Sequence, residues 1–153
     1  MELIILVDYT LTSPGGGAAL REINFALNSG DRVSIVAHVR DDVRLFIRGL
    51  ASLVYPTSGK FFFQGKELDF SDYRNLLAYK QKVGYIASDA SFISNRSVRD
   101  NLMFMINYLE NEFPATPSDD IIELCRMFHL DTKQDLLPAD LDPEKMRSAI
   151  IIR

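Results

Sequence analysis

The sequence contains very little cysteine and histidine. Among its 153 residues there are one cysteine, Cys125, and two histidines, His38 and His129. A single cysteine excludes a disulfide within the chain and suits a reducing compartment. No cysteine, histidine and carboxylate set has the spacing of a metal site, and no serine, histidine and aspartate set suggests a nucleophile. We therefore expect no metal ion and no covalent catalysis, and we expect Cys125 to be a buried structural thiol.

The chain also lacks a basic charge excess and a long hydrophobic run. Its net charge is −4, which gives no reason to expect nucleic acid or an anionic membrane as the main partner. No stretch approaches the roughly 18 apolar residues of a membrane-spanning helix. Residues 1–7 are too short an apolar run for a signal peptide and have no basic lead-in. We expect a cytoplasmic protein without direct membrane insertion, which reaches the inner face of a membrane only through a partner.

The 47% of apolar residues is enough for a real core, and their order predicts an α/β fold. Alternating apolar residues and flanking turn residues predict strands over residues 3–7, 20–27, 32–36, 60–64 and 82–87. Apolar residues at helical spacing predict helices over residues 45–53, 73–79, 99–109 and 119–130, with a last helix after Asp142. The strand over residues 60–64 carries three consecutive phenylalanines, so we expect burial on both faces.

Residues 33–45 have the setting of a phosphate-binding loop without its chemistry. A hydrophobic strand enters a polar turn, and a helical pattern follows. In a P-loop the turn reads G-x-x-x-x-G-K-[ST], where glycines let backbone N–H groups approach phosphate, the lysine neutralises charge and the hydroxyl binds Mg²⁺. The four fixed positions are here Ala37, Asp42, Val43 and Arg44. The surroundings of the loop are kept, and its phosphate-binding groups are replaced.

The replacements act against phosphate. Loss of the lysine removes a charge-assisted contact of about 1.5–3 kcal/mol. Asp41 and Asp42 place carboxylates where phosphate oxygens would lie, and such like charges repel by about 1 kcal/mol even in water. Arg40 and Arg44 are the residues that could compensate. The simpler interpretation is a solvated turn with local ion pairs.

Five further segments together resemble the nucleotide-binding domain of an ABC transporter. They are residues 19–31 (ALREINFALNSGD), 49–59 (GLASLVYPTSG), 64–68 (QGKEL), 83–86 (VGYI) and 97–102 (SVRDNL). The resemblance covers the N-terminal portion of such a domain along all 153 residues. It implies a P-loop NTPase-like, ABC-type partial domain with N-terminal antiparallel strands and an α/β core in residues 1–88, and a helical subdomain in residues 89–153.

The chain departs from the family at its functional positions. Ser13 lies where the family has an aromatic residue that stacks on adenine, and Ser88 where a glutamine contacts Mg²⁺ and the attacking water. Residues 141–145 (LDPEK) lie where the signature L-S-G-G-Q would be; Asp142 and Glu144 suit a helix start but repel phosphate. The family's Walker B strand and catalytic glutamate would follow residue 153.

The resemblance therefore implies a degenerate nucleotide site and no catalytic residue. Its positions are Ala37, Arg40, Asp42, Val43, Arg44 and Ser88. We expect no cofactor, with ATP and Mg²⁺ bound only if Arg40 and Arg44 compensate.

The segment after Ser88 is the better candidate for a functional surface. In the family, this region receives the coupling helix of the membrane subunit. Here Phe92, Ile93 and Arg96 stand among polar residues, as at many interfaces. We expect a transmembrane or other subunit of a transport complex to dock on them. The alternative is that Phe92 packs back into the helical subdomain.

Three interpretations of function remain open. The first is a degenerate subunit that does not hydrolyse ATP and has a structural or regulatory role in a membrane transport complex. The second is an ATP-binding subunit whose catalysis depends on a competent partner. The third is a fragment of a longer pseudo-ATPase. Because an open hydrophobic sheet edge tends to pair with another chain, we also expect self-association.

Overall fold

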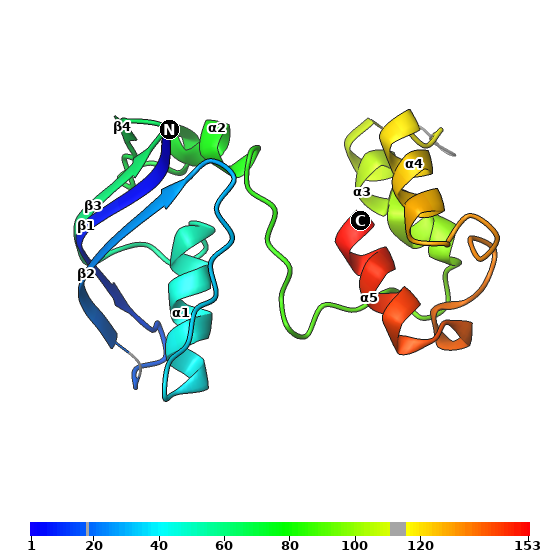
Figure 1. Cartoon of the computed structure of the whole chain (residues 1–153), viewed down its shortest axis with the longest axis horizontal. Coiled ribbons are helices and arrows are strands. Elements are labelled where there is room, and N and C mark those ends of the chain that lie inside the picture. Colours follow the sequence, from blue (N-terminus) through cyan, green and yellow to red (C-terminus); the bar gives the residue numbers. More distant parts are fainter. Residues whose placement is uncertain (18, 111–115) are drawn as a thin grey trace. The chain divides into compact units, whose positions relative to one another are not determined.

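The computed structural model describes residues 1–17, 19–110 and 116–153. The chain divides into two compact units, Met1–Tyr85 and Ile86–Arg153, which are described separately below. The elements of each unit are labelled in Figure 1.

The first unit is built on a four-stranded antiparallel sheet with the order β2-β1-β3-β4. The strands are β1 (Glu2–Thr12), β2 (Ala19–Asn28), β3 (Ser58–Phe63) and β4 (Lys66–Glu67). β1 lies in the middle, where Leu6 is opposite Phe25 of β2 and Phe61 of β3. The strands predicted over residues 3–7, 20–27 and 60–64 are confirmed. Only Phe61 of the three phenylalanines is fully buried, so the expected burial on both faces is wrong.

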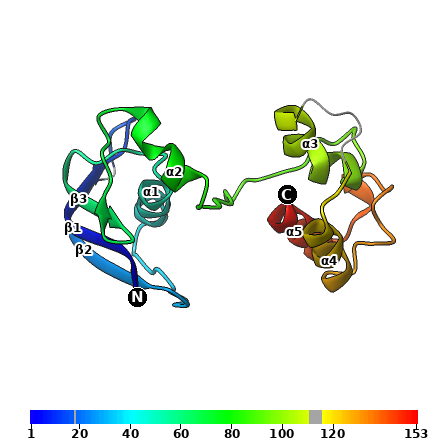
Figure 2. The same cartoon turned by 90° about the horizontal axis from the view of Figure 1, so that it is seen from above.

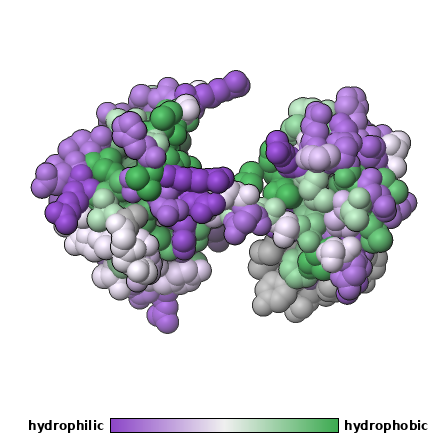
Figure 3. Space-filling model, turned by 90° about the horizontal axis from the view of Figure 1, so that it is seen from below, coloured by the Kyte–Doolittle hydropathy of each residue, from purple (hydrophilic) through white to green (hydrophobic). Residues whose placement is uncertain are grey.

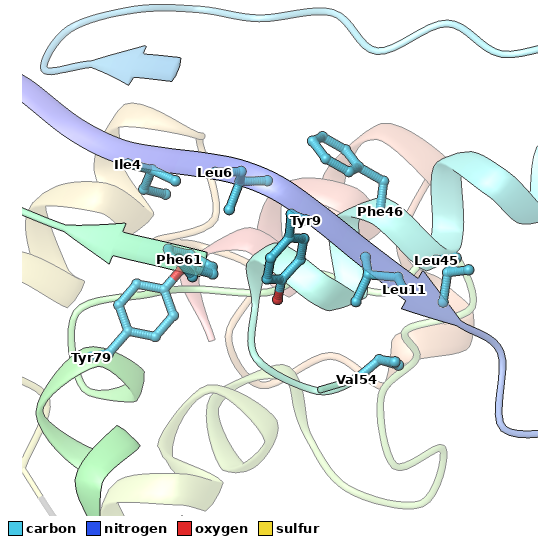
Figure 4. Packing of buried hydrophobic residues seen from close by; sticks show 9 residues of the cluster. All are labelled: Ile4, Leu6, Tyr9, Leu11, Leu45, Phe46, Val54, Phe61 and Tyr79. Carbon is cyan, nitrogen blue, oxygen red and sulfur yellow. The ribbon is translucent and has the colours of Figure 1, made fainter. Parts of the chain in front are cut away.

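Helix α1 (Arg40–Leu50) lies along one side of this sheet (Figures 1 and 2). Its buried residues Leu45 and Phe46 join the core of the unit, whose residues Figure 4 shows around β1. Phe46 meets the ring of Phe25 edge-on at 5.4 Å. Gly49 permits close approach to the sheet, because a Cβ at this position would collide with the side chain of Leu11. Helix α1 begins five residues before the predicted range and ends three residues before its end.

Two predicted strands are wrong. Residues 32–36 and 82–87, all of them described, form no strand. Their β-branched composition favours an extended backbone, but a strand also needs a neighbouring strand with which to pair, and none lies alongside. The helix predicted over residues 73–79, by contrast, is confirmed: the 3₁₀ helix η1 (Tyr73–Leu76) continues into α2 (Leu77–Lys80).

The second unit consists of helices. They are α3 (Val98–Glu110), α4 (Asp119–Met127), the 3₁₀ helix η2 (Pro138–Asp140) and α5 (Pro143–Ile152). They surround a separate core that includes Val98, Leu102, Cys125 and Leu130. Cys125 is buried, as predicted. None of the described helices is long and apolar enough to cross a membrane.

The ends of these helices follow capping chemistry. The side chains of Ser118 and Asp142 accept hydrogen bonds from the backbone N–H groups of Ile121 and Lys145, which caps α4 and α5. α4 ends three residues before the end of the predicted range, because His129 adopts a left-handed conformation (φ 55°) that stops the helix. His129 is thus the residue at which α4 ends.

The described elements combine strands and helices, as the predicted α/β class requires, although the predicted core strands over residues 32–36 and 82–87 are unpaired.

Candidate functional site

A pocket of about 520 Å³ lies between the turn that follows β1 and the first turns of α1. It is lined by Ser13, Pro14, Gly16, Gly17, Ala19, Val39, Asp41, Asp42, Arg44, Leu45, Arg48 and Val54. The pocket thus combines the glycine-rich turn with the segment that has the setting of a phosphate loop. It is the candidate functional site of the first unit.

The glycine-rich turn forms one wall. The backbone N–H of Gly16 donates to the carbonyl oxygen of Ser13 at 3.0 Å. Gly16 and Gly17 have φ values of 76° and 94°, which side-chain-bearing residues rarely adopt. This turn places Ser13 in the lining of the pocket.

The start of α1 forms the opposite wall. Val39 precedes the helix and has no polar side-chain atom with which to cap it. Asp41 and Asp42 lie in the first turn, where carboxylates stabilise the positive end of the helix dipole. The guanidinium of Arg44 lies 3.7 Å from the carboxylate of Asp41, so part of its charge is paired within the same helix turn.

Only some of the predicted site residues line the pocket. Asp42 and Arg44 line the pocket, and their assignment to a degenerate nucleotide site stays a prediction. The described residues that line it do not include Ala37, Arg40 or Val43.

Ser88 is exposed and belongs to the second unit. Arg40, which was expected to compensate together with Arg44, is not among the lining residues, whereas Arg48 is. Sequence analysis did not assign Arg48, although the four-residue spacing from Arg44 places both residues on one helix face.

The segment predicted to dock a partner is only partly exposed. Phe92 is 8% exposed and belongs to the core of the second unit, with the guanidinium of Arg153 at 5.4 Å from its ring centre. Arg153 also donates to the carbonyl oxygen of Ser91 at 3.0 Å. The expectation of an exposed Phe92 is therefore wrong, and the alternative, in which it packs into the helical subdomain, is confirmed. Ile93 (39% exposed) and Arg96 remain at the surface.

The start of α5, where the family signature would lie, is occupied by its own cap. The carboxylate of Asp142 accepts from the backbone N–H of Lys145 at 2.8 Å, and the amine of Lys133 lies 3.6 Å away. The hydrogen bond from Lys145 is the main cause that lowers the pKa of Asp142. The negative charge is thus held at the helix N-terminus, the position where an anion would otherwise bind.

The part of the chain that the structure describes contains no metal-binding cluster. No group of three or more histidine, cysteine, aspartate or glutamate residues there could hold a metal ion. Burial raises the pKa of the Cys125 thiol, which keeps it protonated and unreactive.

Curated relatives of the chain are ABC transporter ATP-binding proteins. A putative ABC transporter ATP-binding protein of Archaeoglobus fulgidus is 32% identical over 98 residues, which are 63% of this chain and 40% of that protein. The methionine import ATP-binding protein MetN of Helicobacter hepaticus is 28% identical over 149 residues, 97% of this chain and 42% of MetN. The chain spans about two-fifths of the length of these relatives. No protein-family model matches the sequence.

Solved structures agree on the fold. CbiO1 of Clostridium perfringens, part of an ABC transporter complex, has a TM-score of 0.74 at 14% identity, and the match covers 99% of this chain and 61% of CbiO1. The bacterial ABC transporter cassette MJ0796 has a TM-score of 0.73 at 18% identity, with 98% of this chain and 68% of the cassette covered. The chain is a homologue of ABC transporter ATP-binding proteins and has the fold of an ABC nucleotide-binding domain.

Proposed function

We propose that the chain is an ABC-type subunit of a membrane transport complex that does not hydrolyse ATP and has a structural or regulatory role on the cytoplasmic side. Its homology to transporter ATP-binding proteins supports the transport context. The charge of the pocket at the start of α1 supports the loss of ATP hydrolysis.

That charge is the single observation that carries the proposal. Asp41 and Asp42 occupy the first turn of α1 and line the pocket, so the positive helix end is already neutralised. A polyphosphate there would meet two carboxylates, and Arg44 is already shared with Asp41. The residues present therefore do not fit a magnesium nucleotide, and we assign no catalytic step to this pocket.

Isothermal titration calorimetry of the chain with MgATP tests this. We expect no saturable binding tighter than about 100 µM, which corresponds to about −5.5 kcal/mol. The matched control is a variant that restores the phosphate-loop pattern, with Ala37→Gly, Asp42→Gly, Val43→Lys and Arg44→Ser. We expect the control to bind more tightly than the natural chain, because it regains the lysine and the glycines and loses one carboxylate.

Tight binding by the natural chain would contradict the proposal. It would favour the second interpretation, an ATP-binding subunit that depends on a competent partner, and Arg44→Ala with Arg48→Ala would then abolish binding.

A membrane or other transport subunit is the partner that we propose for the exposed part of residues 93–97. Ile93 and Arg96 combine an apolar and a cationic side chain at the surface, which suits the core and rim of an interface. Co-purification with the membrane subunit is the test. We expect Ile93→Asp with Arg96→Glu to reduce the complex, and Phe104→Ser, which changes another exposed apolar residue of the same unit, to leave it intact. Equal loss in both variants would remove the assignment.

A further inference from the structure

A second pocket lies within the helical unit, between α3 and α4. Its volume is about 320 Å³. Leu102 and Met103 of α3 and Cys125 of α4 line it and are each at most 4% exposed, so they form an apolar floor. The half-buried Ile121 and Ile122 of α4 add to the apolar lining.

The shape and lining of this pocket favour a small apolar guest. Single apolar residues also reach the surface of the second unit, as Figure 3 shows, and such residues are ordinary in folded proteins. A concave apolar pocket differs from them, because water inside it finds few hydrogen-bond partners, whereas an apolar group gains by leaving water. A volume of about 320 Å³ is at the lower end of the range of small-molecule sites.

Two further residues of the lining offer hydrogen-bond donors. The backbone N–H of Arg99 donates to the carbonyl oxygen of Gln134 at 2.9 Å, which holds these two lining residues side by side. Neither side chain makes a hydrogen bond or an ion pair with another described residue. Arg99 is exposed, so its charged group stays in contact with water while other residues form the buried floor. A guanidinium with unused donors suits a carboxylate, which it can bind through two hydrogen bonds.

We propose that this pocket binds a small molecule that combines an apolar chain with a carboxylate. The chain lies against Leu102, Met103 and Ile122, and the carboxylate accepts hydrogen bonds from the side chains of Arg99 and Gln134. Among the described residues that line the pocket, Arg99 is the one cation and none is acidic, in contrast to the pocket at the start of α1. The site lies in the other unit and needs no nucleotide, so it goes beyond the proposed function.

Nuclear magnetic resonance of the isotope-labelled 153-residue chain is the measurement, with hexanoate and 1-hexanol as the probes. The two probes have the same chain length and differ in the charge of the head group. We expect hexanoate to shift the backbone amide signals of Leu102, Ile122 and Cys125 saturably, with a dissociation constant below about 1 mM.

Three variants separate the apolar contact from the charge. Arg99→Gln should raise the dissociation constant of hexanoate about tenfold and leave that of hexanol unchanged, because only the carboxylate uses the lost charge. Arg126→Gln is the matched control: it removes an exposed arginine of α4 that does not line the pocket, and it should change neither probe. Ile122→Trp should abolish the binding of both probes by filling the pocket. Circular dichroism checks that each variant is folded.

Three outcomes would overturn the proposal. The absence of saturable shifts with hexanoate would show that the pocket takes no such ligand. Equal effects of Arg99→Gln on hexanoate and hexanol, or equal effects of Arg99→Gln and Arg126→Gln on hexanoate, would show that Arg99 does not recognise the carboxylate. Shifts that persist in Ile122→Trp would place the binding elsewhere. None of these results depends on the titration with MgATP, so this proposal and the proposed function fail separately.

Discussion

Asn101 and Ile93 exchange hydrogen bonds in both directions. The backbone N–H of Ile93 donates to the side-chain oxygen of Asn101 at 2.7 Å, and the side-chain NH₂ of Asn101 donates to the Ile93 carbonyl oxygen at 3.0 Å. The same NH₂ group lies at 3.2 and 3.0 Å from the carbonyl oxygens of Arg96 and Ser97. One side chain of α3, only 1% exposed, therefore holds the whole loop that carries the proposed docking residues.

Asn101→Ala should destabilise the second unit by about 2–4 kcal/mol, because it leaves several main-chain groups of the loop unpaired. Asn101→Asp should cost more, since it keeps an acceptor but points a buried carboxylate at three carbonyl oxygens. Urea unfolding of both variants measures the difference. If Asn101→Asp were the milder change, the hydrogen-bond assignment of this side chain would be wrong.

The hydroxyl groups of Tyr9 and Tyr79 differ in their partners. The Tyr79 hydroxyl donates to the carbonyl oxygen of Leu50, whereas the buried Tyr9 hydroxyl has no partner among the described residues. Burial raises the pKa of both groups above the ordinary value for tyrosine, so both stay neutral over the whole physiological range.

Tyr9→Phe should leave stability unchanged or raise it by up to about 1 kcal/mol, because it removes an unpaired buried hydroxyl. Tyr79→Phe should lower stability by about 1 kcal/mol, because it removes a hydrogen bond that is made. Thermal unfolding of the two variants, which make the same chemical change in one core, provides the comparison. A loss in Tyr9→Phe as large as in Tyr79→Phe would show that the Tyr9 hydroxyl has a partner.

The elements that were predicted correctly are those whose signals are local. The cap at Asp142, for example, begins α5, and the few neighbouring residues of the helix start contain the information. Residues 32–36 were predicted as a strand for the same local reason. Their failure to pair depends on a neighbouring strand, which no local pattern contains.

The sequence indicates where in the chain the candidate site lies, but not which side chains line its pocket. The loop between an extended segment and a helix contains Asp42 and Arg44, and both line the pocket. Arg48, and not Arg40, completes the lining, although both are four residues from Arg44, so the spacing alone does not choose between them. Likewise, an aromatic residue in a polar loop can face either way, and Phe92 packs into the core of the second unit with residues of α3 and α5. Such choices depend on packing between elements that are distant in sequence.

Gly59 is a position where no other residue fits. Its φ is 86°, and a Cβ there would collide with the main chain of Asp8 and Tyr9 in β1. Gly59→Ala should therefore destabilise the first unit by about 3 kcal/mol or more, since backbone strain and a main-chain clash add. Gly65→Ala is the control: φ is 77° but the space is open, so only about 1 kcal/mol is expected. Chemical denaturation measures both, and equal losses would mean that the contact with β1 carries no cost.

The cap of α5 should make the second unit sensitive to acid. The backbone N–H of Lys145, with smaller contributions from the charges of Lys133 and Lys145, lowers the pKa of Asp142 from its ordinary value of 3.8. A carboxyl group with a lower pKa in the folded state stabilises the fold fully above its unfolded-state pKa, and that stabilisation is lost as the pH falls through the folded-state value. The natural chain should therefore lose stability below about pH 4. Asp142→Asn keeps a capping oxygen but cannot titrate, so its stability should fall less steeply over the same interval. Urea midpoints at pH 6, 4 and 3 measure the two slopes, and parallel slopes would show that the charge of Asp142 does not stabilise the helix.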